Sequence, residues 1–370
     1  MLALGAGPSG ASPAAKPGLG KKLARALDRL AAAQSGPPGV LVLLRTGGGR
    51  IFATRGTANT KTGRAPAVDD HMRIASVSKA YSGAVALALA ERGKLSLDDT
   101  IGEWLPGVLP KADAVTVAEL LQHTGGVPEY IETDEFRHAL QRDPKAYLSP
   151  EEVVSFVRDE PLDFTPGAKY RYSDTDNNVV GLIAERASGR SYGSLLRRFA
   201  LRPIGATDTS LPRTVRMPKP FLHGYDIEPG GPPDDVSELV NPAGAWASGG
   251  IVSTPNELGR FMRAYVGARL FGRATRRLQH SFVEGSSSPP GPGQNSAGLG
   301  VFRYRTGCGT VFGHTGSFPG YRMFAASSRD GRRSVVFATS SQIVPGMGSP
   351  EVSDLTRRAQ RLAVCRILGD

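Results

Sequence analysis

The strand-like segments of this chain lie at its two ends, and a long, mostly helical stretch from Ser76 to about Val240 separates them. Near the N-terminus, an apolar run at 39–44 is followed by a glycine-rich turn and a returning strand at 51–56. Beyond residue 293, further strand-like runs occur at 298–304, 310–313, 321–327 and 334–339. An economical fold brings the two ends together in one antiparallel sheet.

Amphipathic helices flank these strands. Residues 19–35 place Leu23, Leu27 and Leu30 at helical spacing, and residues 351–368 form a closing helix. We therefore expect an α/β (α+β) fold, in which an antiparallel sheet is covered by the terminal helices and carries an inserted, mostly helical lobe. The expected division is a discontinuous sheet domain, 19–80 with 245–370, and a helical domain, 81–244. A cleft between lobes is a usual place for a small-molecule site.

Composition narrows the function classes. The 370 residues are 40% apolar and 21% charged, as in soluble globular proteins, and no run of eighteen apolar residues predicts a transmembrane helix. The net charge is +11, but the Lys and Arg residues are scattered and form no basic run or zinc-finger spacing. This pattern argues against nucleic-acid binding and suits an enzyme working near an anionic cell wall or membrane surface.

Two features leave alternatives open. Residues 1–18 are rich in Pro, Gly and Ala, and are either a flexible tail of a cytoplasmic protein or the end of a signal peptide. We favour the second interpretation, which predicts a secreted or extracytoplasmic protein. The only two cysteines, Cys308 and Cys365, are compatible with one disulfide or with two buried thiols.

Three short motifs carry candidate chemistry. Ser76 and Lys79 are three residues apart at the start of an apolar helix, so they share a face on which the amine can take the hydroxyl proton. The start of a helix also favours negative charge developing at Ser76. The second motif is Tyr172-Ser173-Asp174, just before a helix, and the third is His314-Thr315-Gly316, at the end of a strand and followed by Ser317.

Around these motifs the chain resembles the serine β-lactamase and D-alanyl-D-alanine carboxypeptidase family, in the branch that includes class C β-lactamases and secreted DD-peptidases. The resemblance covers roughly Gly39 to Ser341. The landmarks that carry it, in order, lie at 73–79, 93–99, 120–128, 164–167, 170–174, 246–254 and 313–321. The third motif has the His-Thr-Gly form that DD-peptidases and related esterases use.

The resemblance implies a role for each motif residue. Ser76 would be the acylated nucleophile, and Lys79 and Tyr172 would share the proton transfers, with either one as the general base. The backbone N–H groups of Ser76 and Ser317 would form the oxyanion hole. Trp246, His314, Thr315 and Gly316 would line the cleft, with His314 and Thr315 holding a substrate carboxylate. No metal or other cofactor is implied.

Two positions depart from the family pattern. Asp174 stands where the family usually has Asn, and an ionised Asp cannot donate a hydrogen bond to a substrate carbonyl. DD-peptidases bind the terminal carboxylate with an arginine near the third motif, for which Arg303 is our candidate and Arg305 lies close by. The resemblance also places the segment before the third motif beside the C-terminal helix, which favours a Cys308–Cys365 bridge and an oxidising compartment.

The expected function is a serine-type D-alanyl-D-alanine carboxypeptidase, with or without transpeptidation, acting on peptidoglycan-type peptides. The alternatives are a carboxylesterase, a class C-type β-lactamase, a peptide cyclase or D-amino-acid amidase, and a non-catalytic penicillin-binding sensor. We expect a monomer whose partner is a substrate ending in D-Ala-D-Ala, a β-lactam or an ester.

Overall fold

A computed structural model describes residues 18–228, 231–267, 269–284, 288–344, 346 and 348–369. The predicted tail or signal remnant, apart from Gly18, lies outside these residues. The strands are β1 (Gly39–Thr46), β2 (Gly49–Gly56), β3 (Met72–Arg73), β4 (Tyr225–Asp226), β5 (Asp234–Asp235), β6 (Val252–Ser253), β7 (Gln294–Gly298), β8 (Val301–Thr306), β9 (Gly309–Phe318), β10 (Tyr321–Ser327) and β11 (Ser334–Thr339).

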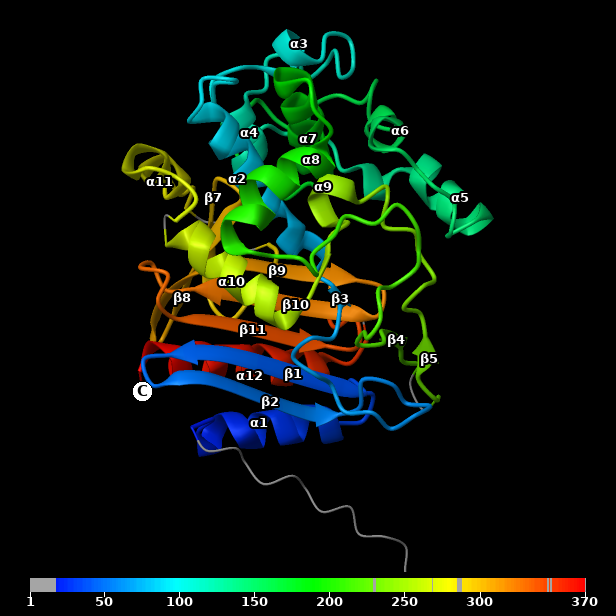
Figure 1. Ribbon diagram of the computed structural model, residues 1–370. Helices are drawn as coiled ribbons and strands as arrows, with labels where there is room; N and C mark the ends of the chain where they lie inside the picture. Colours follow the sequence, from blue (N-terminus) through cyan, green and yellow to red (C-terminus); the bar gives the residue numbers. More distant parts are fainter. Residues whose placement is uncertain are drawn as a thin grey trace, which may run out of the picture.

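Helices cover the sheet and build the upper lobe in Figure 1. They are α1 (Lys21–Ala32), α2 (Ser78–Ala90), α3 (Ile101–Trp104), α4 (Val117–Gln122), α5 (Asp134–Arg142), α6 (Pro150–Ser155), α7 (Asp174–Ser188), α8 (Tyr192–Leu196), α9 (Trp246–Gly249), α10 (Pro255–Val266), α11 (Arg273–Gln279) and α12 (Pro350–Leu368). Short helical turns are η1 (Ala75–Val77), η2 (Tyr130–Glu132), η3 (Arg197–Leu201) and η4 (Arg202–Ile204).

The two ends of the chain meet in one seven-stranded antiparallel sheet, which confirms the predicted architecture. Its order is β2-β1-β11-β10-β9-β8-β7, and β1 lies against β11 with Val40 opposite Thr339. Figure 1 shows α1 and α12 on one side of this sheet and α10 with the helical lobe on the other. Both faces of β1 are therefore covered, which explains its uninterrupted apolar run.

Alternate residues of the central strands enter two different cores. Val42 packs with the terminal helices, while its neighbour Leu41 belongs to the core shared with the helical lobe. The core that contains Leu41 runs continuously from the sheet into α2, α4 and α7. The sheet and the helical lobe are thus held together by one apolar cluster, and the predicted domain boundaries stay a prediction.

The third motif lies inside a strand and not at its end. Sequence patterning predicts a strand only over 310–313, but β9 continues to Phe318 and includes His314, Thr315 and Gly316. Hydrogen bonding to β10 over this whole length, with Gly316 opposite Met323, carries the strand through a segment of low strand propensity. Strand β7, which sequence analysis does not predict, pairs with β8 at the edge of the sheet.

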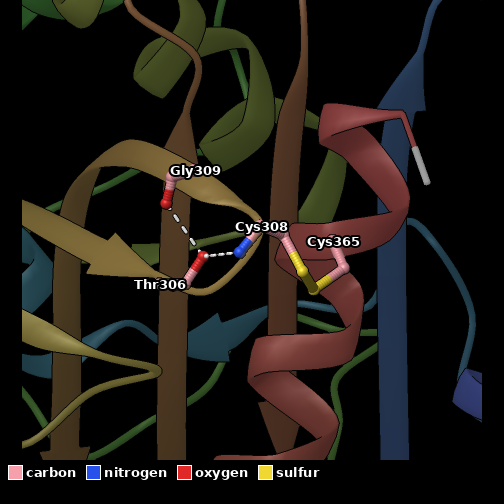
Figure 2. The surroundings of a disulfide bond; sticks show 4 residues. All are labelled: Thr306, Cys308, Gly309 and Cys365. Atoms are coloured by element: carbon pink, nitrogen blue, oxygen red, sulfur yellow. Dashed lines mark hydrogen bonds between the residues drawn. A yellow bond between two sulfur atoms is a disulfide. The ribbon is translucent and has the colours of Figure 1, made fainter.

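Cys308 and Cys365 are joined in the structure, with their Cα atoms 5.1 Å apart. Figure 2 shows Cys308 in the turn between β8 and β9 and Cys365 on α12. Thr306 braces this turn, since its hydroxyl accepts a hydrogen bond from Cys308 N and donates one to Gly309 O. The bridge therefore ties the start of β9 to the C-terminal helix. No helix among the described residues is long and apolar enough to cross a membrane.

Replacing both cysteines by serine is expected to lower the free energy of unfolding by about 4 kcal/mol, because the bridge closes a loop over a sequence separation of 57. Urea unfolding followed by circular dichroism measures the change. A reducing agent should destabilise the natural protein and leave the double variant unaffected. A natural protein indifferent to reductant would contradict the bridge.

Candidate active site

Ser76 lies in a tight turn pressed against the sheet. The turn η1 precedes α2, and Ala75 adopts a left-handed backbone with φ of 51°. A Cβ atom on Gly316 of β9 would lie 2.4 Å from Ile74 O, so a glycine is required where the strand crosses the turn. This close approach brings Ser76 beside Ser317, which follows Gly316 on β9. Both serines line one cavity.

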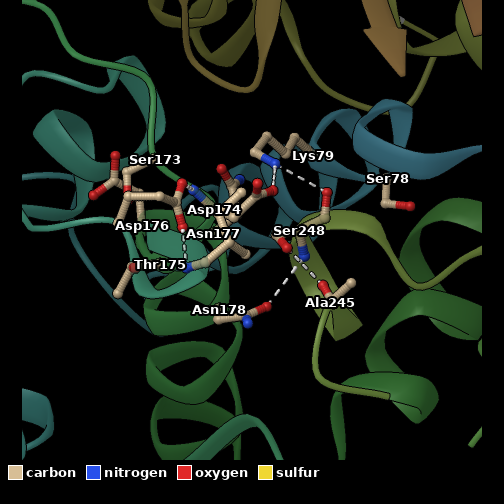
Figure 3. A network of polar contacts seen from close by, with 12 residues as sticks. Ser78, Lys79, Ser173, Asp174, Thr175, Asp176, Asn177, Asn178, Ala245 and Ser248 are labelled. Atoms are coloured by element: carbon tan, nitrogen blue, oxygen red, sulfur yellow. Dashed lines mark hydrogen bonds and ion pairs between the residues drawn. The ribbon is translucent and has the colours of Figure 1, made fainter. Parts of the chain in front are cut away.

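Lys79 is completely buried on the first turn of α2. Its ammonium group forms an ion pair with Asp174 and donates a hydrogen bond to Ser248 O at 3.1 Å. Figure 3 shows the side chain reaching both groups. Lys79 Nζ also lies 4.7 Å from the centroid of the Tyr172 ring. The structure therefore brings the first two motifs together, with Asp174 as the counter-ion of the lysine.

The hydroxyl of Tyr172 is buried at this junction. It makes no hydrogen bond of ordinary geometry with any described residue, but it lies close enough to Ser76 to interact with it. Burial raises the pKa of Tyr172 well above its usual value, the charge of Asp174 adds to this rise, and the interaction with Ser76 opposes it. The phenol is thus protonated in the resting protein and is placed to exchange a proton with Ser76.

A histidine–aspartate pair packs against the ring of Tyr172, and sequence patterning alone does not predict this pair. His123 follows α4 and its Nδ1 lies 2.8 Å from Asp176 Oδ2. The ring centroids of His123 and Tyr172 are 4.6 Å apart. Burial lowers the pKa of His123 and raises that of Asp176, so each group is pushed towards its neutral form. The signal in the sequence is the landmark at 120–128, whose residues carry no evident chemistry until the fold is known.

Glu129 is a second group that sequence analysis missed. It is buried, and its carboxylate accepts hydrogen bonds from Asp174 N at 2.5 Å and Ile131 N at 3.3 Å. Burial and then the nearby charge of Asp174 raise the pKa of Glu129 to about 8. Glu129 therefore holds the backbone of Asp174 in place from behind the site.

The cavity beside Ser76 has a volume of about 150 Å³ and is mainly apolar. Asp174 is the only carboxylate among the described residues that line it, and none of them is Lys, Arg or His. Its apolar wall comes from segments around η2, α5 and the loops that follow, together with β9: Tyr130, Ile131, Phe136, Leu140, Pro144, Ala146, Leu148, Val240 and Phe318.

Four predicted cleft residues lie elsewhere or face inward. Trp246 packs on Tyr192, with ring centroids 4.9 Å apart, and lines a separate cavity. Arg303 pairs with Glu284 and covers the ring of Phe282 at 4.8 Å. His314 and Thr315 are buried in β9, where strand alternation puts them on opposite faces.

These placements correct the predicted binding roles. The ring of His314 packs against those of Tyr172 and Phe302, with centroid distances of 6.1 and 4.9 Å. Burial and the charge of Lys79 lower the pKa of His314 to about 3, so the imidazole is neutral. A neutral, buried His314 supports Tyr172 and offers no charge to a substrate carboxylate. Within the described part of the chain, no group of three or more His, Cys, Asp or Glu side chains could hold a metal ion.

Replacing Glu129 by Gln is expected to change how stability depends on pH. Between the ordinary pKa of 4.5 and the folded value of about 8, folded Glu129 keeps a proton that the unfolded chain has lost. The free energy of unfolding then falls as pH rises, with a slope of up to ~1.4 kcal/mol per pH unit for one proton. Glu129→Gln removes this contribution, so its stability relative to the natural protein should increase from pH 5 to pH 8.

Urea unfolding of both proteins at several pH values measures this difference. The comparison is made at constant ionic strength because Asp174 and Lys79 lie close to Glu129. A stability difference that stays constant over the whole range would show that Glu129 titrates normally.

Comparisons with known proteins identify the family of this chain. A family model described as Beta-lactamase matches residues 23–352. Penicillin-binding protein 4* of Bacillus subtilis is 25% identical over 287 residues, which are 73% of this chain and 60% of that protein. The D-alanyl-D-alanine-carboxypeptidase/endopeptidase AmpH of Escherichia coli is 24% identical over 65% of this chain and 61% of its own length. The matches thus span about three fifths of these curated relatives.

Solved structures match over nearly their full length. A D-stereospecific amidohydrolase from Streptomyces sp. has a TM-score of 0.78 and 28% identity, covering 89% of this chain and 96% of that one. The D-amino acid amidase from Ochrobactrum anthropi SV3, in complex with L-phenylalanine amide, has a TM-score of 0.80 and 24% identity, covering 93% and 98%.

Proposed function

The chain belongs to the β-lactamase family, and we propose that it is a serine hydrolase that cleaves amide bonds through an acyl-enzyme on Ser76. The observation that carries this proposal is the arrangement of Ser76, which lines the cavity, beside the buried hydroxyl of Tyr172, whose ring in turn contacts the buried ammonium group of Lys79. A serine becomes nucleophilic when a neighbouring group accepts its proton, and Tyr172 can do so by giving up its own proton at the same time.

The proposed reaction proceeds in two steps. Ser76 Oγ attacks the carbonyl carbon and passes its proton to the Tyr172 oxygen, while the Tyr172 hydroxyl gives its own proton to the leaving amine, and the ammonium group of Lys79 stabilises the phenolate character that develops during this exchange. The N–H groups of Ser76 and Ser317 stabilise the oxyanion, because the contact at Gly316 holds strand and turn together. Water then attacks the acyl-enzyme by the reverse proton path and releases the acid.

Two substrate classes fit this reaction. The His-Thr-Gly motif and the name of AmpH favour a D-alanyl-D-alanine carboxypeptidase. The cavity favours a D-amino-acid amidase, because its wall is apolar and none of its described residues is a cation that could hold a terminal carboxylate. We give the amidase the first place on this observation. The proposed location is extracytoplasmic, which suits the Cys308–Cys365 bridge.

Ser76→Ala is expected to abolish acylation. Incubation with a penicillin or an activated phenyl ester, followed by intact-mass spectrometry, should give a covalent adduct on the natural protein only. Steady-state turnover of the ester then separates an enzyme from a penicillin-binding sensor, which is acylated once and stops. The nucleophile assignment fails if the natural protein gives no adduct with either reagent.

Ala146→Phe is expected to narrow substrate choice, because Ala146 lines the apolar wall of the cavity. The value of kcat/KM for D-phenylalaninamide should fall by ~10-fold or more, while that for D-alaninamide changes little. Ala32→Phe, at the exposed end of α1, serves as the matched control.

Release of D-alanine from a peptide ending in D-Ala-D-Ala, measured on the natural protein, ranks the carboxypeptidase against the amidase. A higher kcat/KM for hydrolysis of this peptide than for hydrolysis of D-phenylalaninamide or D-alaninamide would put the carboxypeptidase first.

A further inference from the structure

Among Lys79, Asp174, Glu129 and Asp176, Asp174 is the residue that lines the cavity. Lys79 is completely buried behind it, whereas the Asp174 side chain keeps 18% of its surface exposed and lines the cavity with Ser76. Lys79 contacts only one carboxylate oxygen, Oδ1. The other oxygen, Oδ2, accepts no hydrogen bond from any described residue and stays available to a ligand.

The carboxylate is held firmly in this position. Asp174 is the first residue of α7, and Glu129 accepts the hydrogen bond from its backbone N–H. The ion pair with Lys79 fixes the side chain from the other side. A group restrained at both its backbone and its side chain can discriminate between ligands, because it cannot move to accommodate a poor partner.

The chemistry of Asp174 is that of an acceptor. An asparagine could donate a hydrogen bond to the carbonyl of an N-acyl substituent, but a carboxylate offers that oxygen only repulsion. An ammonium group, by contrast, donates a charge-assisted hydrogen bond to it. Among the described residues that line the cavity, no other ionised side chain competes for such a group.

We propose that Asp174 selects acyl donors that carry a free α-ammonium group beside the scissile carbonyl, and that it disfavours N-acylated ones. This inference rests on the proposed function and names the residue that recognises the α-amine of an amino-acid amide. The α-nitrogen is attached to the carbon next to the reacting carbonyl, so a carbonyl at Ser76 brings it near Asp174.

Three contacts then define the acyl group. Its carbonyl lies at Ser76 and Ser317, its ammonium at Asp174, and its side chain in the apolar part of the cavity. Three different contacts around one α-carbon distinguish the two enantiomers, because the mirror image can satisfy only two of them in the same orientation. The same arrangement that recognises the amine therefore makes the site stereospecific.

The test compares matched substrates that differ only at the α-nitrogen, the p-nitroanilides of D-phenylalanine and of N-acetyl-D-phenylalanine. We expect the natural protein to prefer the free amine by ~10-fold or more in kcat/KM. In Asp174→Asn this ratio should fall at least tenfold. The ratio cancels any general loss of reactivity that follows from removing the partner of Lys79. Asp163→Asn, which changes an acid paired with Arg171 outside the cavity, should leave the ratio unchanged.

If Asp174→Asn no longer hydrolyses either substrate, the preference is measured instead as ligand binding to a protein that lacks Ser76. In a Ser76→Ala background, calorimetry should detect D-phenylalaninamide more tightly bound than its N-acetyl derivative, and adding Asp174→Asn should remove the difference. A thermal melt establishes that the variants are folded.

The outcomes separate the two levels of the proposal. An unchanged ratio in Asp174→Asn, or a natural preference for the N-acetyl substrate, overturns the role of Asp174 and leaves the serine hydrolase intact. Failure of the natural protein to form an acyl-enzyme with any reagent overturns the proposed function, and the selection of an ammonium group falls with it.

Discussion

The pairing of β1 with β11 is the contact on which the rest of the molecule depends. It joins residues from the two ends of the chain, such as Val40 and Thr339, and makes one sheet from two sequence blocks. Everything between them must leave the sheet and return to it. After β2 the chain leaves the sheet for the segment that includes η1 and α2, which carry Ser76 and Lys79, and it returns in β7 and β8, ahead of β9, which carries Ser317. Ser76, Lys79 and Ser317 come together because both ends of the chain share one sheet.

The site concentrates charge where water is scarce. Lys79, Asp174, Glu129 and Asp176 are all wholly or largely buried, and the pKa values of the last two are raised mainly by burial. Such a cluster is stable only if few of its members are ionised together. The Lys79–Asp174 ion pair can persist because Glu129 and Asp176 are pushed towards their neutral forms. Helix α7 contributes to two of these contacts, since Asp174 and Asp176 point to different sides of its first turn. Asp174 pairs with Lys79, and Asp176 contacts His123.

Local patterns predicted the architecture well, and the structure brings the side chains of the first two motifs together. Burial patterns identify β1, β10 and β11, and the spacing of Ser76 and Lys79 already implies a shared helical face. The roles of Glu129 and His123 could not be predicted, because they arise from burial against residues more than forty positions away. Arg303 does not line the cavity, because nearness in sequence to a motif does not decide which partner a long side chain finds, and Arg303 pairs with Glu284.

The contact between Gly316 and the turn before α2 restricts which residues can occupy one side of the site, whereas the residues of the apolar wall can be replaced more freely. Any side chain there would meet backbone atoms of the nucleophile turn, so neither strand nor turn can drift without losing the other. The apolar wall of the cavity is built from side chains of η2, α5 and the loops around residues 144–148 and 240. Lineages of this fold can therefore acquire new substrates by rebuilding that wall while the hydrolytic apparatus stays the same. Divergence in sequence at α5, with conservation of strand β9, is the pattern that natural selection should leave behind.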